Sequence, residues 1–142
     1  MISVNNVKFI FIFYEIQIKE ISIIYKQEIF TFRYEHMSII TIFKSIKQEV
    51  DSTIVSEKTE IIAVSKTFPI IHIKPLIDFG HKNYGENKVQ EAEMKWIDVK
   101  KNKPDIKLHM VGRLQSNKAK KAVSLFDYIH SLDSEKLALV LN

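Results

Sequence analysis

The chain contains no cysteine, and its 142 residues include only three glycines and three prolines. The absence of cysteine excludes disulfides, thiolate nucleophiles and cysteine-ligated zinc, and it suits the cytoplasmic protein that we expect. No run approaches the roughly 20 apolar residues that a membrane span needs, so we expect no membrane partner. With so few glycines, neither the dinucleotide-binding G-x-G-x-x-G pattern nor a P-loop occurs.

The charge excess is small, with a formal net charge of +4 at pH 7. Residues 1–36 hold four basic and four acidic side chains, so the whole excess lies in residues 37–142. A mixed, solvated surface is the favoured explanation, and we do not expect a nucleic-acid partner. The alternative is a basic nucleic-acid-binding module that uses Lys118, Lys120 and Lys121.

The chain divides into two parts at Met37. Residues 1–36 contain no glycine, proline or alanine, and their alternation over 15–21 and the apolar run 8–14 are typical of strands. They show no signal-peptide pattern. We interpret them as a separate extension produced by translation upstream of the true start, with Met37 as the natural first residue.

From residue 38 onward, strand patterns alternate with helical ones. A leading helix, capped by Ser38, is predicted from apolar positions at helical spacing: Ile39, Ile42, Phe43, Ile46 and Val50. Strands are predicted over 60–66, 82–84, 106–111 and 128–130, each followed by a helix. This alternation predicts an α/β fold with a parallel sheet, made of about four strand–helix units behind one helix.

Four local features are predicted inside this pattern. Gly80 suits a left-handed position at a helix end. Glu91 and Lys95 are spaced to form an ion pair on the outside of their helix. Val123 is expected on a buried helix face, and Asp133 is expected to cap the last helix.

Lys66 is the residue that points most directly to chemistry. It ends an apolar strand, and in α/β proteins the loops after the strands form the ligand-binding face. Its amine, once neutral, can attack an aldehyde to form an imine. The alternative from this segment alone is a solvated cation at a strand end.

Four motifs in order carry a family resemblance. They are Ala63-Val64-Ser65-Lys66-Thr67, the run 84–91 (YGENKVQE), the run 109–118 (HMVGRLQSNK) and His130-Ser131-Leu132-Asp133. Together they resemble the pyridoxal phosphate homeostasis proteins (the YggS/PROSC type), whose fold is the barrel domain of alanine racemase. The resemblance covers residues 37–142, whereas residues 1–36 match nothing in that family.

The resemblance implies a partial (β/α)8 barrel of the alanine racemase N-terminal type and a set of cofactor-binding residues. Lys66 would form the internal aldimine with pyridoxal 5'-phosphate, and Asn87 would lie near the cofactor or cap the next helix. His109 would lie inside the barrel, either as a cofactor contact or as a satisfied core residue. Ser131 would face the pocket or begin the next helix. No catalytic residue is implied, and the other histidines show no metal-ligand spacing: His36, His72, His81 and His130.

The resemblance also implies what the protein does. The family carries and buffers the cofactor in vitamin B6 and amino-acid homeostasis, without established catalysis. Its phosphate-binding loops would lie beyond Asn142, so the chain would be the N-terminal half of the barrel. Such a half should leave the inner face of the sheet uncovered and two edges open, and these edges favour self-association. Three alternatives stay open: an amino-acid racemase-like enzyme, an inactive fragment of a degraded gene, and the nucleic-acid module.

Overall fold

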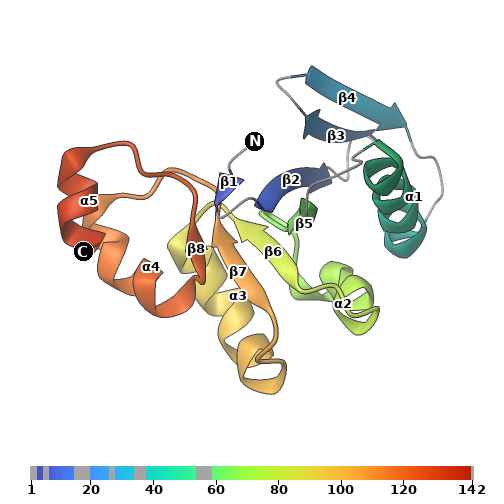
Figure 1. Ribbon diagram of the computed structural model, residues 1–142. Helices are drawn as coiled ribbons and strands as arrows, with labels where there is room; N and C mark the ends of the chain where they lie inside the picture. The colour runs from blue at the N-terminus through green and yellow to red at the C-terminus, as the bar shows by residue number, and fades with distance from the viewer. Residues whose placement is uncertain are drawn as a thin grey trace.

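A computed structural model of the protein describes residues 3–4, 7–14, 20–25, 28–33, 38–53 and 59–141 (Figure 1). Before Met37 the backbone forms β1 (Ser3–Val4), β2 (Val7–Tyr14), β3 (Glu20–Tyr25) and β4 (Glu28–Arg33). The next helix is α1 (Ile39–Thr53). Four strand–helix units follow: β5 (Thr59–Val64) with α2 (Ile70–Asp78), β6 (Asn83–Glu86) with α3 (Val89–Asn102), β7 (Lys107–Met110) with η1 (Ser116–Lys118) and α4 (Ala119–Leu125), and β8 (Tyr128–Ile129) with α5 (Glu135–Leu141). Within the described ranges, no helix is long and apolar enough to cross a membrane.

The strands form one sheet in the order β4-β3-β2-β5-β6-β7-β8, with β1 paired to β2. Strands β5 to β8 are parallel, as the alternation of strands and helices predicts. β2 also lies parallel to β5, in a register that runs from Lys8 opposite Thr59 to Phe13 opposite Val64. The prediction of two open edges is therefore wrong at β5, whose free side is occupied by β2. β8 stands at the other end of the sheet.

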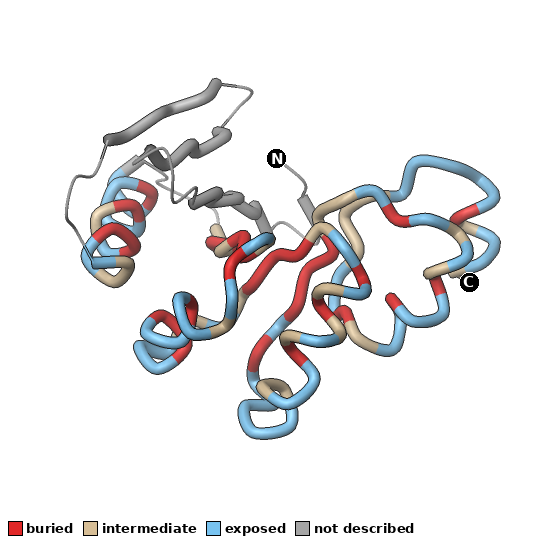
Figure 2. Tube along the Cα trace, turned by 180° about the vertical axis from the view of Figure 1, so that it is seen from behind, coloured by how far each residue is buried: buried red, intermediate tan, exposed pale blue. Residues whose placement is uncertain are grey.

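The helices cover one face of the parallel strands and bury the main core. Ser38 caps α1, because its Oγ accepts a hydrogen bond from the Thr41 amide at 3.2 Å. The core cluster unites buried side chains of α1, α2 and α3 with Ile61, Tyr84, Leu108 and Met110 from the strands. Figure 2 shows this burial along the strands, while the outer sides of the helices are exposed. The predicted partial barrel of four β/α units behind a leading helix is confirmed.

Part of the opposite face of the strands is also buried. Ile62 and Val64 are 0% and 4% exposed, and His109 on β7 is 0% exposed. Gly85 lies among these residues, and a Cβ placed on it would lie 3.1 Å from methyl carbons of both Ile62 and Val64. The prediction that the inner face stays uncovered is therefore wrong at these positions.

Local features of the units confirm some predictions and correct others. Gly80, just after α2, has a φ of 98° and so takes the predicted left-handed conformation. Val123 is 56% exposed, so its predicted burial is wrong, because the seven-residue α4 buries only Ala119 and Ala122. Asp133 does not cap α5. Ser134 takes that role, because its Oγ accepts a hydrogen bond from the Leu137 amide at 3.2 Å.

Candidate functional site at the carboxyl ends of the parallel strands

The carboxyl ends of β5 to β8 meet at one edge of the sheet. Hydrogen bonds of the parallel ladder continue past the strands, from the Ser65 amide to the Gly85 carbonyl at 2.9 Å and from the Val111 amide to the Glu86 carbonyl at 2.9 Å. The His130 amide likewise donates to the Met110 carbonyl at 2.9 Å. Three of the predicted site residues, Lys66, Asn87 and Ser131, follow immediately after these bonds. In open parallel sheets, this edge is where ligands bind.

Lys66 lies at the corner of a tight turn that leaves β5. The Phe68 amide donates to the Ser65 carbonyl at 3.2 Å, which closes a four-residue turn with Lys66 at its second position. Thr67, at the third position, has a φ of 65°. A positive φ on a β-branched residue is strained by about 1–3 kcal/mol, and such strain concentrates at functional sites. The turn therefore presents Lys66 at the strand edge in a conformation that the surrounding structure must hold.

A buried ionic cluster lies directly beneath this turn. Glu86, the last residue of β6, is fully buried, and its Oε1 accepts three hydrogen bonds. The donors are Ser65 Oγ at 2.7 Å, Lys95 Nζ at 2.7 Å and Trp96 Nε1 at 2.9 Å. Lys95 Nζ also donates to the carbonyl oxygen of Ser65 at 2.6 Å. The backbone on the strand side of Lys66 is thereby tied to both β6 and α3.

The predicted ion pair between Glu91 and Lys95 is wrong. Lys95 points inward, with a side chain 11% exposed, and pairs with Glu86. Glu91 instead pairs with Lys88 at 2.7 Å. Helical spacing alone identifies Glu91 as a neighbour of Lys95, but a buried carboxylate attracts the ammonium more strongly than a solvated one.

Asn87 follows Glu86 and packs tightly against the next strand end. A Cβ on Gly112 would lie 2.4 Å from the backbone oxygen of Asn87, so only glycine allows this approach. The alternative role of Asn87 as a helix cap is wrong, because Lys88 occupies the N-cap position of α3. Within the described part of the chain, Asn87 Oδ1 is buried without a hydrogen-bond partner. A buried amide oxygen of this kind is an acceptor held ready for a ligand or a water molecule.

Ser131 completes the edge on the side of β8. Its Oγ donates to the carbonyl oxygen of Gly112, which joins the loops after β7 and β8. The alternative in which Ser131 begins the last helix is wrong, because α5 begins at Glu135. Asn87, Gly112 and Ser131 thus form a continuous rim beside Lys66.

His109 lies inside the sheet rather than at this rim, as its strand position predicts. Both ring nitrogens are bonded, Nδ1 to His130 Nε2 at 2.9 Å and Nε2 to Asn83 Oδ1 at 3.2 Å. Its ring stacks on Tyr128 with centroids 4.6 Å apart. Burial lowers the pKa of His109 to about 3, so the ring is neutral near pH 7. These contacts match the alternative of a satisfied core histidine, and a contact of His109 with the cofactor stays a prediction.

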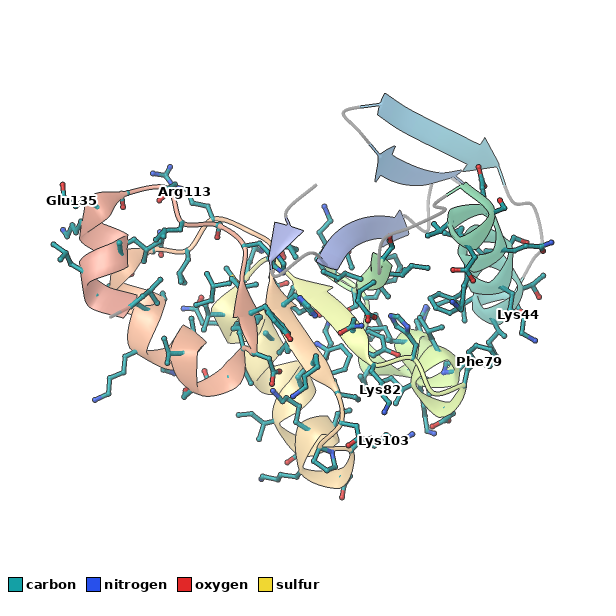
Figure 3. All side chains as sticks on the ribbon, viewed as in Figure 1. Lys44, Phe79, Lys82, Lys103, Arg113 and Glu135 are labelled. Atoms are coloured by element: carbon teal, nitrogen blue, oxygen red, sulfur yellow. The ribbon has the colours of Figure 1, made fainter. Side chains whose placement is uncertain are left out.

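A polar pocket is lined by Asn87, by residues 113–116 and by Lys118. The pocket has a volume of about 610 Å³ and also contacts the start of α3 and the loop before α5. Arg113, labelled in Figure 3, reaches that loop, where its Nε lies 3.0 Å from Asp133 Oδ2. Among the described residues, no group of three His, Cys, Asp or Glu side chains is arranged to hold a metal ion.

Sequence reasoning missed the cluster of Ser65, Glu86, Lys95 and Trp96. Part of the signal was present in the sequence, because Glu86 lies two residues beyond the predicted strand 82–84 and Trp96 lies one residue beyond Lys95. Only the packing of α3 on β6, however, shows that Lys95 turns inward.

Comparison with known proteins identifies relatives of part of the chain. No protein-family model matches it. It is 39% identical over 98 residues to the "Pyridoxal phosphate homeostasis protein" of Synechocystis sp.. The aligned region is 69% of this chain and 44% of that protein. A protein of the same name from Buchnera aphidicola subsp. Acyrthosiphon pisum is 43% identical over 86 residues, covering 61% of this chain and 42% of that protein. The chain thus spans less than half the length of these curated relatives.

Solved structures give a consistent result. PipY of Synechococcus elongatus, solved without pyridoxal phosphate, matches with a TM-score of 0.64 and 40% identity, covering 72% of this chain and 45% of that one. The structure of PipY with pyridoxal phosphate bound matches with a TM-score of 0.58, covering 68% of this chain and 45% of that one.

Proposed function

Because the chain belongs, over the region that matches, to the pyridoxal phosphate homeostasis proteins, we propose that it binds pyridoxal 5'-phosphate through a lysine aldimine at Lys66. In this proposal the protein carries and buffers the cofactor in the cytoplasm, in vitamin B6 and amino-acid homeostasis, and does not catalyse a reaction. The relatives' names and the PipY structure with bound pyridoxal phosphate support the choice of cofactor.

The position of Lys66 is the observation that carries the proposal. It follows β5 at the same sheet edge as Asn87 and Ser131, on a turn held by buried contacts beneath it. It is also the lysine that follows the strand, in the motif on which the family resemblance rests. Lys88 lies at the same distance past β6, but it stands at the start of α3 and its Nζ pairs with Glu91 Oε1 at 2.7 Å.

The residues around Lys66 fit a flat, polar cofactor. Among the residues that the structure describes, none pairs with the buried Asn87 Oδ1, so this acceptor can bind a polar ring substituent. Gly112 leaves the rim free of a side chain where the loops after β6 and β7 meet. Of the four predicted cofactor-binding residues, Lys66, Asn87 and Ser131 share the rim, and His109 lies deeper in the sheet.

The chemistry required of the chain is simple. Lys66 would hold the cofactor through its amine, with loss of one water from the amine and the aldehyde, and hydrolysis of that bond would release the cofactor again. When bound, the cofactor would supply an electron-withdrawing ring. For a carrier role, the protein has to position the amine and protect the bond.

The nucleic-acid alternative receives little support from the surface. Lys121, one of its three lysines, pairs with Glu93, with Nζ–Oε distances of 3.1 and 2.9 Å. This pairing neutralises part of the charge on which that alternative relies. Binding of nucleic acid would depend steeply on salt, whereas a covalent cofactor bond would not.

Reduction with borohydride tests the proposal. The chain is mixed with pyridoxal phosphate, reduced and digested, and the labelled peptide is identified by mass spectrometry. We expect the label on Lys66, and we expect Lys66→Ala to lose the label. Lys101 is an exposed lysine of α3, and Lys101→Ala should keep the label on Lys66. A label spread over surface lysines and unchanged in Lys66→Ala would contradict the proposal.

A further inference from the structure

The ammonium of Lys95 bridges two groups near Lys66. One is the backbone carbonyl of Ser65, the residue before Lys66, and the other is the buried carboxylate of Glu86. Lys95 Nζ lies 2.6 Å from the Ser65 carbonyl oxygen and 2.7 Å from Glu86 Oε1. The side chains of Lys95 and Glu86 are 11% and 0% exposed. Lys101 on the same helix shows the usual alternative, an ammonium in water 3.3 Å from Asp98.

Stability alone does not explain why an ion pair occupies this place. A well-packed apolar pair of the same volume is often as stable as a buried salt bridge. A buried ammonium needs acceptors for its remaining protons, and the acceptor that Lys95 takes beside Glu86 is the Ser65 carbonyl oxygen. That carbonyl belongs to the residue directly before Lys66.

The Ser65 carbonyl is also the atom that closes the turn. It accepts from the Phe68 amide at 3.2 Å, across the strained Thr67. Ser65 is held further by its Oγ, which donates to Glu86 Oε1 at 2.7 Å. Ser65 is thus held from both α3 and β6, and Lys66 is the next residue in the turn so held. Strained backbone persists only where surrounding contacts determine it.

We propose that Lys95 is a positioning residue for Lys66: it ties the Ser65 carbonyl to Glu86 and so fixes the turn that presents the Lys66 amine to an aldehyde. This inference rests on the proposed function and adds a residue that does not touch the cofactor. Misplacement of a reacting group by about 1 Å can reduce its rate about 100-fold, so loss of this tie should be visible in the rate of imine formation.

The test uses three variants of the full chain. Lys95→Met removes the ammonium but leaves the Glu86 carboxylate buried, so this variant also tests the cost of an unpaired buried charge. The double variant Lys95→Met with Glu86→Gln removes both charges, while the new amide oxygen still accepts from Ser65 and Trp96. Lys101→Met is the matched control on the exposed side of α3.

We measure the rate at which the imine absorbance band appears after pyridoxal phosphate is added. Borohydride reduction and mass spectrometry then identify the labelled lysine. Only samples that circular dichroism shows to be folded are compared. In the double variant, we expect the rate at Lys66 to fall about 10- to 100-fold and the label to shift to surface lysines. A folded double variant that labels Lys66 at the rate of Lys101→Met would overturn the inference alone. A wild-type chain without label at Lys66 would overturn the proposed function and this inference with it.

Discussion

His109 accepts a hydrogen bond from His130 across the ends of β7 and β8, with 2.9 Å between Nδ1 and Nε2. The direction follows from the neighbouring contacts. Asn83 Nδ2 donates to Glu60 Oε2 at 3.2 Å, so its Oδ1 must accept from His109 Nε2–H. His109 Nδ1 then has no proton and can only accept. A second proton on His109 would therefore remove this hydrogen bond and place a charge inside the sheet.

Acid should therefore destabilise the fold through its buried histidines. Burial lowers the pKa of His109 to about 3 and that of His81 to about 4, from 6.5, and it also lowers the pKa of His130. Since the unfolded chain binds these protons more readily, the stability is complete above pH 6.5 and is lost as the pH falls from 6.5 toward 4 and 3. Each histidine should contribute up to about 1.4 kcal/mol per pH unit.

Urea unfolding at several pH values between 7.5 and 4.5 measures this slope. His109→Gln should flatten it, because the amide does not titrate. If the free energy of unfolding of His109→Gln depends on pH as steeply as that of the wild-type chain, His109 does not contribute to the acid destabilisation.

Gly112 should not tolerate a side chain. Gly112→Ala places a Cβ 2.4 Å from the Asn87 backbone oxygen, so the loops after β6 and β7 must separate. We expect a loss of about 1–3 kcal/mol in the free energy of unfolding, together with weaker cofactor labelling.

Gly80→Ala is the matched control for this variant. Its Cβ would meet no atom of the described residues within 4 Å, and its φ of 98° opposes the change. It should therefore lose about 1–2 kcal/mol without affecting the rim. Equal labelling in the two variants would show that the contact between Gly112 and Asn87 has no role at the site.

Breaking the pair of Lys95 and Glu86 should be among the most destabilising single changes in the chain. Lys95→Met leaves a fully buried carboxylate with two donors in place of three, and we expect a loss of about 3–5 kcal/mol. Lys101→Met removes an exposed ion pair and should change stability by less than about 0.5 kcal/mol. Thermal unfolding of both variants compares these losses, and similar melting temperatures would show that the buried pair contributes little.

Residues 1–36 allow a direct test of the proposed boundary at Met37. If they are a separate extension, a chain beginning at Met37 should be at least as soluble as the full chain and should unfold at a similar temperature. The feature that opposes this outcome is the register between β2 and β5, which runs over Lys8 to Phe13. A shortened chain that loses its cooperative unfolding, by circular dichroism, would show that β2 is an integral strand of the sheet.

The sequence predicts the order of elements well because each unit carries its own periodicity. The apolar spacing of 39–50 predicts α1, and the alternation of short apolar runs with helical patterns predicts the parallel strands. Alternation does not reveal what covers the second face of a sheet, so the burial of Ile62 and Val64 was not predicted.

The site was predictable only where a residue follows a strand. Lys66, Asn87 and Ser131 do so, and their common edge follows from the parallel order. Lys95 does not, because its role depends on which way α3 turns on β6, and helical spacing favours the nearer Glu91 instead. The cluster beneath Lys66 is therefore a result of tertiary packing.

The identity of the labelled lysine tests the central claim most directly. After pyridoxal phosphate and borohydride are added to the full chain, we expect a single reduced adduct on the peptide that contains Lys66. We also expect Lys66→Ala to abolish this adduct while circular dichroism shows an unchanged fold. An adduct of equal yield in Lys66→Ala, or one located on other lysines in the wild-type chain, would contradict this claim.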